Sequence, residues 1–268
     1  MAAILPRVRH VLVEPQFGGN TGACARVLKN LGFDRLVLVD PAFEITDREA
    51  VKMAVAAGDV LASATVCAGI DDGLSRTGMV VGTSRRLGKH RRPHHRIDEL
   101  APEIAEFAAA GGDVAVVFGR EDHGLSDRDL DRCTHLAYLP AAEAYPSFNL
   151  AQAVGIVSWE IARAAESFRE PGSEDRDEDE DGEGARPSDH VEREAMYRHL
   201  ESALRTIGFL HPDSAEPLMR RLRRLIGRAT PTDVEVRVLR GIARQVLWAA
   251  DRAGLERRDG AGDDDRSG

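Results

Sequence analysis

Apolar residues in the first 170 positions gather in short runs that alternate with longer segments of helical periodicity. The short runs are largely apolar at consecutive positions, which is typical of strands buried on both faces. They cover residues 8–13, 36–39, 79–82, 114–118 and 136–139. The longer segments repeat apolar residues every three or four positions and predict helices over residues 22–31, 47–57, 97–109 and 148–166. This alternation predicts an α/β fold, a doubly wound parallel sheet covered on both faces.

The remainder of the chain has a different pattern. Residues 170–185 contain nine acidic side chains and one arginine without an apolar repeat, so we expect residues 170–189 to form an acidic, disordered linker. Residues 190–258 are helical in pattern, and residues 259–268 resemble the linker. The chain is therefore expected to consist of an α/β domain over residues 1–169, the linker, a small helical domain and a disordered acidic tail.

The helical domain is predicted to hold three helices, over residues 190–207, 216–227 and 232–253. Pro231 suits the first turn of the last helix, and Thr230 is its candidate N-cap. The apolar stripes of these helices predict that they pack on one another or on a partner.

Composition narrows the classes of protein. The 268 residues carry a formal net charge of -9, but much of it lies in the linker and the tail, so a nucleic-acid partner is not excluded. No stretch approaches the roughly 20 consecutive apolar residues of a membrane span, and the first residues lack a signal-peptide pattern. We therefore expect a cytoplasmic protein that does not enter a membrane. Cys24, Cys67 and Cys133 lie far apart, which predicts buried free thiols and no zinc site.

Candidate chemistry is expected beyond the carboxyl ends of the strands, where parallel α/β sheets bind their ligands. Residues 14–26 form a glycine-rich turn in which Asn20 is able to cap a helix. Residues 116–125 end a strand at Gly119 and continue with charged residues, and residues 139–155 lead through a polar loop into a helix. Taken singly, each segment also suits an ordinary capped turn, because neither a P-loop nor a G-x-G-x-x-G pattern is present.

Taken together and in this order, the three segments resemble the motifs of the SPOUT methyltransferases, and among them the TrmH-like RNA ribose 2′-O-methyltransferases. The matching positions are Asn20, Gly22 and Arg26 of N-x-G-x-x-x-R, Phe118, Gly119, Glu121, Gly124 and Leu125 of F-G-x-E-x-x-G-L, and Ser147, Asn149 and Leu150 of S-x-N-L. Residues 80–85, the basic loop after them and the helical extension further resemble the TrmJ branch, which modifies nucleotide 32 in the tRNA anticodon loop.

The resemblance implies a C-terminal trefoil knot in the α/β domain, a homodimer, and S-adenosylmethionine as the cofactor, held among three loops largely by main-chain groups. The implied cofactor-binding residues are Thr83, Ser84, Arg85, Gly119, Leu139, Pro146, Ser147, Phe148 and Asn149. Glu121 and His123 lack the spacing of metal ligands, and the chemistry requires no metal, so none is expected. We expect Glu121 to hydrogen-bond loop main chain or to support the partner's site.

The resemblance also implies roles in catalysis for Arg26, Asn20 and Ser147. A ribose 2′-hydroxyl is a poor nucleophile until its proton is lost or shared. A guanidinium has a pKa above about 12 and stays protonated, so we interpret Arg26 as a group that holds the adjacent phosphate and stabilises developing charge, rather than as a base. Asn20 and Ser147 then fix the ribose.

Positive charge is dense in residues 85–96, which hold six permanent cations and three histidines directly after a predicted strand end. This pattern indicates a phosphate-binding loop at the mouth of the site, with a plain solvated charge run as the alternative. The candidate RNA-binding residues are Arg86, Lys89, Arg91, Arg92 and Arg96 here, and Arg221 and Arg224 in a second basic cluster of the helical domain. That cluster consists of Arg220, Arg221, Arg223, Arg224 and Arg228.

The combined prediction is an S-adenosylmethionine-dependent tRNA ribose 2′-O-methyltransferase that acts on nucleotide 32. Cytidine is the expected base, and the acceptance of uridine is left open. Two alternatives are the same reaction on ribosomal RNA and a non-catalytic RNA-binding or assembly protein with the same fold. The intact Asn20, Arg26, Gly119, Ser147 and Asn149 argue against the second alternative.

Overall fold

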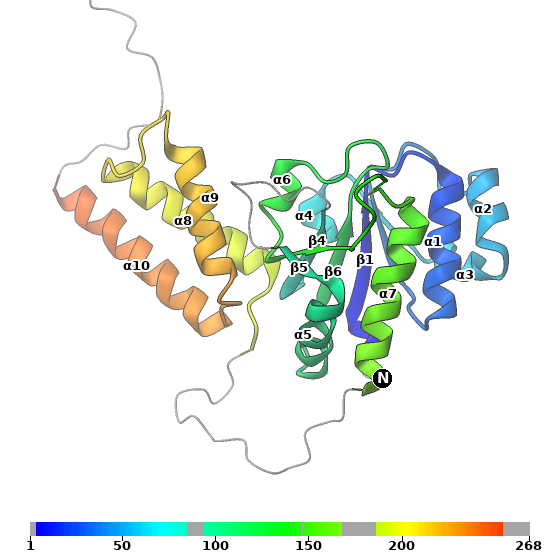
Figure 1. The fold of residues 1–268 in the computed structure, drawn as a ribbon. Helices are drawn as coiled ribbons and strands as arrows, with labels where there is room; N and C mark the ends of the chain where they lie inside the picture. The colour runs from blue at the N-terminus through cyan, green and yellow to red at the C-terminus, as the bar shows by residue number, and fades with distance from the viewer. Residues whose placement is uncertain (1–3, 85–93, 146, 168–185, 254–268) are drawn as a thin grey trace, which may run out of the picture.

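The computed structural model describes residues 4–84, 94–145, 147–167 and 186–253, and its centre is a seven-stranded parallel sheet (Figure 1). The strand order is β3-β2-β1-β6-β4-β7-β5, and every neighbouring pair is parallel. The strands are β1 (Val8–Val13), β2 (Arg35–Val39), β3 (Thr65–Cys67), β4 (Met79–Thr83), β5 (His94–Arg96), β6 (Val114–Phe118) and β7 (His135–Tyr138). The predicted parallel α/β fold is confirmed.

Both faces of the sheet are buried, which explains why the central strands are apolar at consecutive positions. In β1, Val8 and Leu12 belong to the core on one face, and Val11 and Val13 belong to the core on the other. Neighbouring side chains of a strand point to opposite faces, so a strand covered on both sides has no solvent-facing positions to fill with polar residues.

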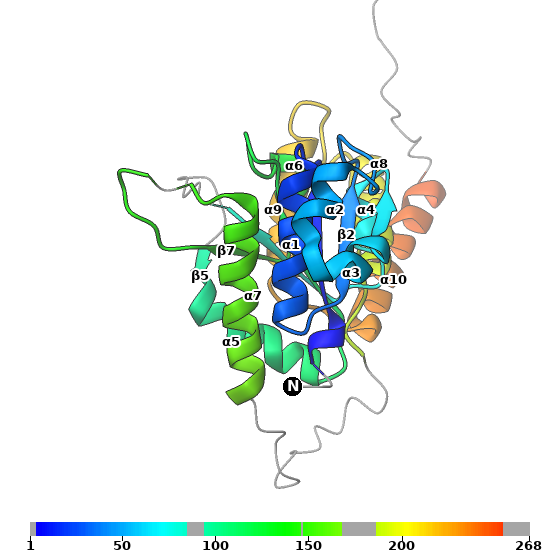
Figure 2. The ribbon, with the colours of Figure 1, turned by 90° about the vertical axis from the view of Figure 1, so that its right-hand side faces the viewer.

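One face is covered by the longer helices of the α/β domain. These are α1 (Gly18–Asn30), α2 (Arg48–Ala54), α3 (Gly58–Ala62), α5 (Ile97–Ala109) and α7 (Leu150–Ser167), with a 3-10 turn (Val55–Ala57) between α2 and α3. Figure 2 shows α1 and α7 side by side, although they come from opposite ends of the domain. The N-terminal ends of these two helices therefore meet at the edge where the strands end.

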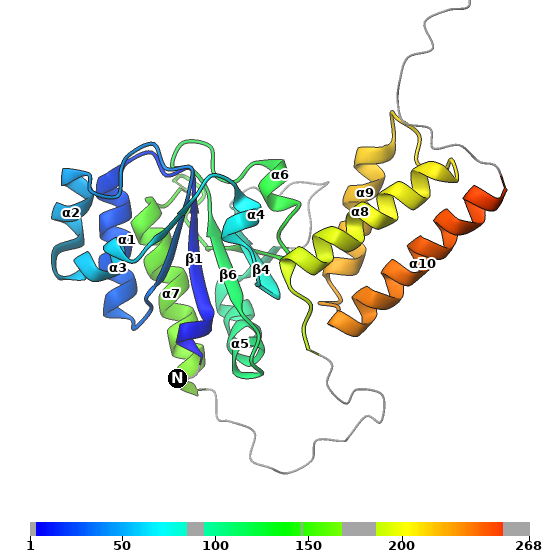
Figure 3. The same cartoon turned by 180° about the vertical axis from the view of Figure 1, so that it is seen from behind.

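The other face is covered by two short helices, α4 (Ile70–Gly73) and α6 (Asp127–Leu130), which pack on a second apolar core. Three C-terminal helices adjoin this side, as Figure 3 shows. They are α8 (His190–Thr206), α9 (Ala215–Gly227) and α10 (Asp233–Arg252), and they share an apolar core of their own. The predicted small helical domain that follows the α/β domain is confirmed.

Polar contacts attach the C-terminal helices to the α/β domain. The buried Arg193 guanidinium donates a hydrogen bond to the Thr77 carbonyl at 3.1 Å, and burial lowers its pKa. The ring Nε2 of His190 lies 2.9 Å from Asp71 Oδ1. His190 and Arg132 hold the pKa of Asp71 well below its usual range. The start of α8 is thus fixed on the sheet by buried polar groups.

Several elements were not predicted because they carry little apolar pattern. The edge strand β5 has the sequence His-His-Arg and lies inside residues 85–96, which the sequence assigned to a phosphate-binding loop. It forms because its backbone pairs with β7. The edge strand β3 and the helices α3, α4 and α6 were also missed, since elements of three to five residues are too short to show a period.

Two helix starts differ from the prediction. Helix α1 begins at Gly18 rather than at residue 22, and Phe17 occupies the N-cap position without a side-chain hydrogen bond. Helix α10 is capped by Thr232, whose hydroxyl accepts a hydrogen bond from the Glu235 backbone N–H. The prediction of Thr230 as that cap was wrong. Thr230 instead adopts a φ of 45°, a left-handed turn conformation that precedes the helix.

Some of the remaining expectations fall on residues that the structure describes, and others fall on residues that it does not describe. The three cysteines are free, with Cys24 and Cys133 buried and Cys67 half-buried. No helix among the described residues is long and apolar enough to cross a membrane. Residues 186–189 are packed, because Ser188 is buried and its backbone N–H bonds to the Pro231 carbonyl. The rest of the predicted linker and the tail lie outside the described residues, and the trefoil knot stays a prediction.

Candidate active site

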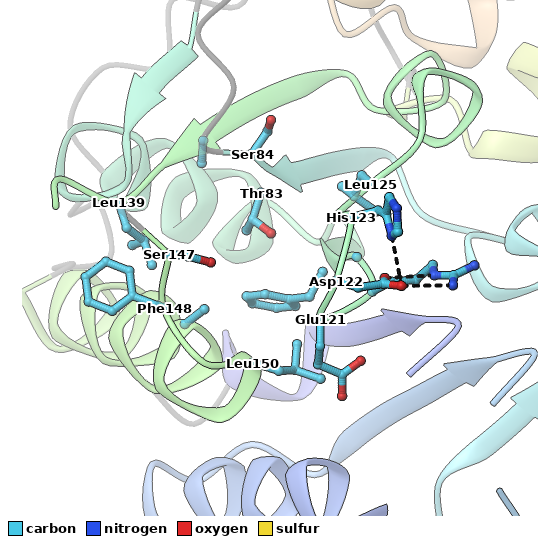
Figure 4. Close-up of a pocket in the computed structure, with 16 residues that line it drawn as sticks. Thr83, Ser84, Glu121, Asp122, His123, Leu125, Leu139, Ser147, Phe148 and Leu150 are labelled. Atoms are coloured by element: carbon cyan, nitrogen blue, oxygen red, sulfur yellow. Dashed lines mark hydrogen bonds and ion pairs between the residues drawn. The ribbon is translucent and has the colours of Figure 1, made fainter. Parts of the chain in front are cut away.

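A pocket lies at the carboxyl ends of β4, β6 and β7, where ligands of a parallel sheet are expected (Figure 4). Of the predicted cofactor-binding residues, six line it: Thr83, Ser84, Gly119, Leu139, Ser147 and Phe148. Figure 4 shows the Ser147 hydroxyl directed into the pocket. Arg85 and Pro146 lie outside the described residues. Asn149 does not line the pocket but stands next to it, at the start of α7.

The loop after β6 forms one wall of the pocket and closes on itself. The Gly124 backbone N–H donates to the Arg120 carbonyl at 2.9 Å, and Gly124 has a φ of 71°. A Cβ at Gly119 would overlap the backbone of Gly124 and Leu125, lying 2.7 Å from the Gly124 oxygen. The sequence suggested that Gly119 lets a ligand approach the main chain. The structure gives a second reason for glycine here, which is the close packing of the loop against itself.

The three motifs meet through one hydrogen-bond network around Asn20. Its Nδ2 donates to Glu121 Oε1 at 3.0 Å, and its Oδ1 accepts from Asn149 Nδ2 at 3.0 Å. The Gln16 backbone N–H donates to Glu121 Oε2 at 2.9 Å, so Glu121 bonds loop main chain as expected. Asn20 was also considered as a helix cap, but its side chain connects α1 to the two other motif segments. Asn149 does both, because its Oδ1 also accepts from the Ala151 N–H at 2.9 Å.

The glycines of the first motif allow α1 to approach α2. A Cβ at Gly22 would lie 2.9 Å from the Ala54 backbone nitrogen, and one at Gly18 would overlap the Asp47 carboxylate, which caps α2. Contacts this short are not tolerated, so both positions require glycine. Close packing of these helices fixes the position of Asn20 at the rim of the pocket.

Arg26 lies apart from the pocket. It is exposed on α1 and makes no hydrogen bond or ion pair with any residue that the structure describes. Because an α-helix turns by 100° per residue, Arg26 points about 120° around the helix from Asn20. Of the three residues implied in catalysis, the structure therefore brings Ser147 into the pocket and Asn20 to its rim, and leaves Arg26 exposed on α1.

The pocket rim also carries charged residues that the motifs did not indicate as a group. Arg120 donates to Glu14 Oε2 at 2.8 Å and to Asp122 Oδ1 at 3.1 Å. His123 Nδ1 lies 2.8 Å from Asp122 Oδ2. Hydrogen bonds from His123 and Arg120 hold the pKa of Asp122 well below its usual range. The rim is thus rich in carboxylates, of which Glu14 and Asp122 are paired with one arginine.

Similarity to known proteins agrees with this arrangement. Residues 7–159 match the SpoU rRNA methylase family, and residues 191–257 match the C-terminal domain of the tRNA methyltransferase TrmJ. The chain belongs to the SpoU methylase family, in its TrmJ branch. The resemblance of the three motifs to this group is therefore confirmed.

Named members of the TrmJ branch cover nearly the whole chain. The tRNA (cytidine/uridine/adenosine-2′-O-)-methyltransferase TrmJ of Pseudomonas aeruginosa (strain UCBPP-PA14) is 36% identical over 259 residues, 96% of this chain and 100% of its own length. The tRNA (cytidine/uridine-2′-O-)-methyltransferase TrmJ of Escherichia coli (strain K12) is 35% identical over 91% of this chain and 96% of its own. The crystal structure of TrmJ from Z. mobilis ZM4 has a TM-score of 0.75 and 29% identity, and covers 89% of this chain and 98% of that chain.

A buried histidine supports the floor of the pocket in this SpoU-family domain. The ring of His10 stacks on Phe118, which lines the pocket, with centroids 6.3 Å apart and an interplanar angle of 12°. Its Nε2 lies 2.8 Å from the Ser158 hydroxyl of α7. Burial lowers the pKa of His10 to about 3, so the ring is neutral in this site. No sequence pattern indicates this role, because His10 occupies a core position within a strand.

The candidate RNA-binding residues of this TrmJ-type chain have different environments. Arg96 donates to Asp98 Oδ2 at 3.0 Å, and this hydrogen bond raises the pKa of Arg96. Arg221 is exposed on α9, and Arg224 is half-buried on the same helix. Four further candidates lie outside the described residues: Arg86, Lys89, Arg91 and Arg92. No group of three or more His, Cys, Asp or Glu side chains that could hold a metal was found within the described parts of the chain.

Proposed function

We propose that this protein is an S-adenosylmethionine-dependent tRNA ribose 2′-O-methyltransferase that acts on nucleotide 32 of the anticodon loop. Cytidine is the proposed base, with uridine as the second base to test, since relatives that span the chain are named for both. The observation that carries the proposal is the network that joins Asn20, Glu121 and Asn149 at the rim of the pocket. It supports the assembly of all three motifs into one site. We propose a cytoplasmic location, because the proposed substrate is a tRNA.

The pocket fits the cofactor in its chemistry. Small-molecule sites are mostly apolar with a few polar groups that fix orientation, and a nucleoside cofactor needs that combination. The walls supply Phe118, Leu125, Leu139 and Leu150 for the adenosine moiety, and the hydroxyl of Ser147 faces inward. The residues proposed to hold the cofactor are Thr83, Ser84, Arg85, Gly119, Leu139, Pro146, Ser147, Phe148 and Asn149. When bound, S-adenosylmethionine supplies an electrophilic methyl group on a sulfonium.

The protein must position the ribose hydroxyl in line with that methyl group and assist loss of its proton. We assign the positioning to Asn20 and Ser147. Asn20 is suited to this role because two hydrogen bonds already fix its side chain. Arg26 remains protonated, so it stabilises the developing alkoxide and holds the neighbouring phosphate through a bidentate contact.

The exposed position of Arg26 favours a homodimer in which it serves the partner's pocket. The surface of α7 beside α1 carries Ile156 and Trp159, and Trp159 is 58% exposed. Gly155 of α7 faces Val27 of α1, so the two helices pack against each other beside this apolar patch, and Arg26 is exposed on α1. A large exposed aromatic residue on such a surface is typical of a protein interface. In this arrangement each pocket is completed by one guanidinium from the partner.

RNA binding is proposed to use two groups of cations. These are Arg86, Lys89, Arg91, Arg92 and Arg96, which follow the pocket residue Ser84 in the sequence, and Arg221 and Arg224 on α9. The proposal predicts that affinity for tRNA falls as the salt concentration rises, because phosphate contacts release counterions.

The test maps methylated nucleotides in tRNA from cells with and without the gene. We expect 2′-O-methylation at nucleotide 32 to be absent in the deletion strain and restored by the wild-type gene but not by an Arg26→Ala variant. An unchanged nucleotide 32 would refute the assignment. Loss of methylation in ribosomal RNA alone would support the same reaction on that RNA instead.

A further inference from the structure

An exposed aromatic side chain, Phe17, lies beside the ribose-positioning residue of the proposed reaction. Phe17 precedes α1 and is 63% exposed. Its carbonyl accepts hydrogen bonds from the backbone N–H groups of Asn20 at 3.1 Å and Thr21 at 3.3 Å. Its backbone is therefore within one helical turn of Asn20.

The backbone on both sides of Phe17 is fixed. The preceding residue, Gln16, donates its N–H to Glu121 Oε2 at 2.9 Å and its side-chain amide to the Glu14 carbonyl at 2.7 Å. The following residue, Gly18, is buried against the α2 cap Asp47. A side chain on such a backbone presents its ring at a defined place, so a ligand that uses the ring gains a preorganised contact.

The surroundings favour a neutral, flat ligand at Phe17 over a phosphate. The rim nearby carries the carboxylates of Glu14, Glu121 and Asp122 and one guanidinium, Arg120, which pairs with two of them. The excess of negative charge disfavours a phosphate there. No aromatic or cationic group contacts the Phe17 ring within the described parts of the chain. In RNA loops, unstacked bases present neutral faces that stack on Phe, Tyr, Trp or His side chains.

We propose that Phe17 stacks on a base of the substrate RNA loop and thereby holds the reacting nucleotide with its ribose at Asn20. This inference rests on the proposed function, because it requires an RNA substrate at the pocket. Phe17 is a positioning residue that acts through the base, and it takes no part in the transfer of the methyl group. Stacking does not read the donors and acceptors of a base, so this contact tolerates both pyrimidines.

The test measures methyl transfer to a tRNA transcript by Phe17→Ala, Phe17→Leu, Phe17→Tyr and Phe17→Trp variants. We expect Phe17→Ala to lower kcat/KM by about tenfold or more, mainly through KM, because one base loses its stacking partner. Phe17→Leu keeps apolar bulk without a π-face and should resemble Phe17→Ala. The two aromatic variants should stay within about threefold of the wild type.

Two readouts separate stacking from a structural effect. Affinity for S-adenosylmethionine, measured by calorimetry, should be the same in all variants, and the salt dependence of tRNA binding should keep its slope because no phosphate contact is lost. The matched control is Phe209→Ala, since Phe209 is also a phenylalanine and is 56% exposed between α8 and α9. It should leave kcat/KM within about twofold.

Each outcome is decisive. Activity of Phe17→Ala within twofold of the wild type overturns the inference, as does rescue by Phe17→Leu. A parallel loss of cofactor affinity in Phe17→Ala also overturns it, because the side chain would then support the pocket itself. If the wild-type protein methylates tRNA and one of these contradicting outcomes is obtained, the stacking role of Phe17 fails and the proposed function stands. If the wild type methylates no RNA, the proposed function fails first.

Discussion

The network around Asn20 and the C-terminal helices use polar side chains in different ways. Around Asn20, side-chain amides, a backbone N–H and the carboxylate of Glu121 join three segments that are distant in sequence. In the C-terminal helices, arginines pair with carboxylates. Arg223 pairs with Glu194 of α8, and Arg220 bridges to Asp131, which follows α6 in the α/β domain. The first arrangement builds a site, whereas the second holds helices and domains together.

This difference shows how to interpret the two basic features that the sequence singled out. The arginine cluster of α9 was expected to grip RNA, yet two of its members are engaged in ion pairs within the chain. Arg26 has no such partner among the described residues although it stands on a well-packed helix. An exposed arginine without an intramolecular partner on a rigid element is available for a ligand, and density of charge alone is a weaker sign of function.

The largest predicted effect tests the free guanidinium of Arg26. Arg26→Lys keeps the charge but removes the planar fork, so we expect kcat to fall by about 100-fold or more. Cofactor affinity and Tm should stay the same, because Arg26 makes no contact in the described protomer. Steady-state methyl transfer and calorimetry provide the measurements. The control is Arg48→Lys, which changes another exposed arginine on the neighbouring α2. Near-normal turnover of Arg26→Lys would contradict the bidentate role.

The next effect tests the closed loop of the rim. Gly119→Ala places a methyl group against the backbone of Gly124 and Leu125, so the loop must move. We expect the affinity for S-adenosylmethionine to fall by about tenfold or more, since overpacking typically costs about 1–3 kcal/mol. Calorimetric titration measures it. Gly58→Ala is the matched control, because a Cβ there meets nothing within 4 Å and φ is -60°. Equal affinities of both variants would show that the loop adapts.

The sequence predicted most of the fold because the central strands and the long helices carry strong patterns. The strands at residues 8–13 and 114–118 and the helix at 97–109 match the structure at both ends. The resemblance of the motifs to a known family named six residues that line the pocket, whereas Asn149 lies beside it. The edge strand β5 was beyond reach of a pattern, because backbone pairing with β7 alone makes it a strand.

The missed parts of the site depend on contacts between distant residues. The ion pair of Arg120 with Glu14 joins the ends of two neighbouring strands, and nothing in either segment specifies the other. The neutral His10 under Phe118 is a core residue whose state follows from burial. Arg220 was assigned to a basic cluster because its partner Asp131 is far away in the chain.

The third prediction tests whether the buried Arg193 couples the C-terminal helices to the α/β domain. Arg193→Met fills a similar volume but leaves the carbonyls of Thr77 and Ser188 without their donor, at a cost of about 2 kcal/mol. Trp159 and Trp248 are the two tryptophans, one in each unit. Proteins that keep only one of these tryptophans report the unfolding of one unit by fluorescence. The two unfolding transitions should coincide when Arg193 is present and separate in the Arg193→Met variant.

The ion pair of Arg220 is partly exposed, so an Arg220→Ala change should lower the free energy of unfolding by less than about 1 kcal/mol.

The last prediction concerns the pH dependence of stability in the core under the pocket. His10 has a folded pKa of about 3, lowered by burial from 6.5, so the folded state stays neutral where the unfolded chain takes up a proton. Its contribution is fully present above pH 6.5 and is lost as the pH falls toward 3, by about 1.4 kcal/mol per pH unit. His10→Gln retains a partner for Ser158 without titrating. Between pH 6.5 and 4.5 the free energy of unfolding of this variant should therefore fall less steeply with decreasing pH than that of the wild type, and the difference in slope should correspond to about one proton. Urea denaturation at a series of pH values measures this slope. Identical slopes for both proteins would mean that His10 accepts a proton in the folded state, and the stacked floor of the pocket would then differ from the arrangement described above.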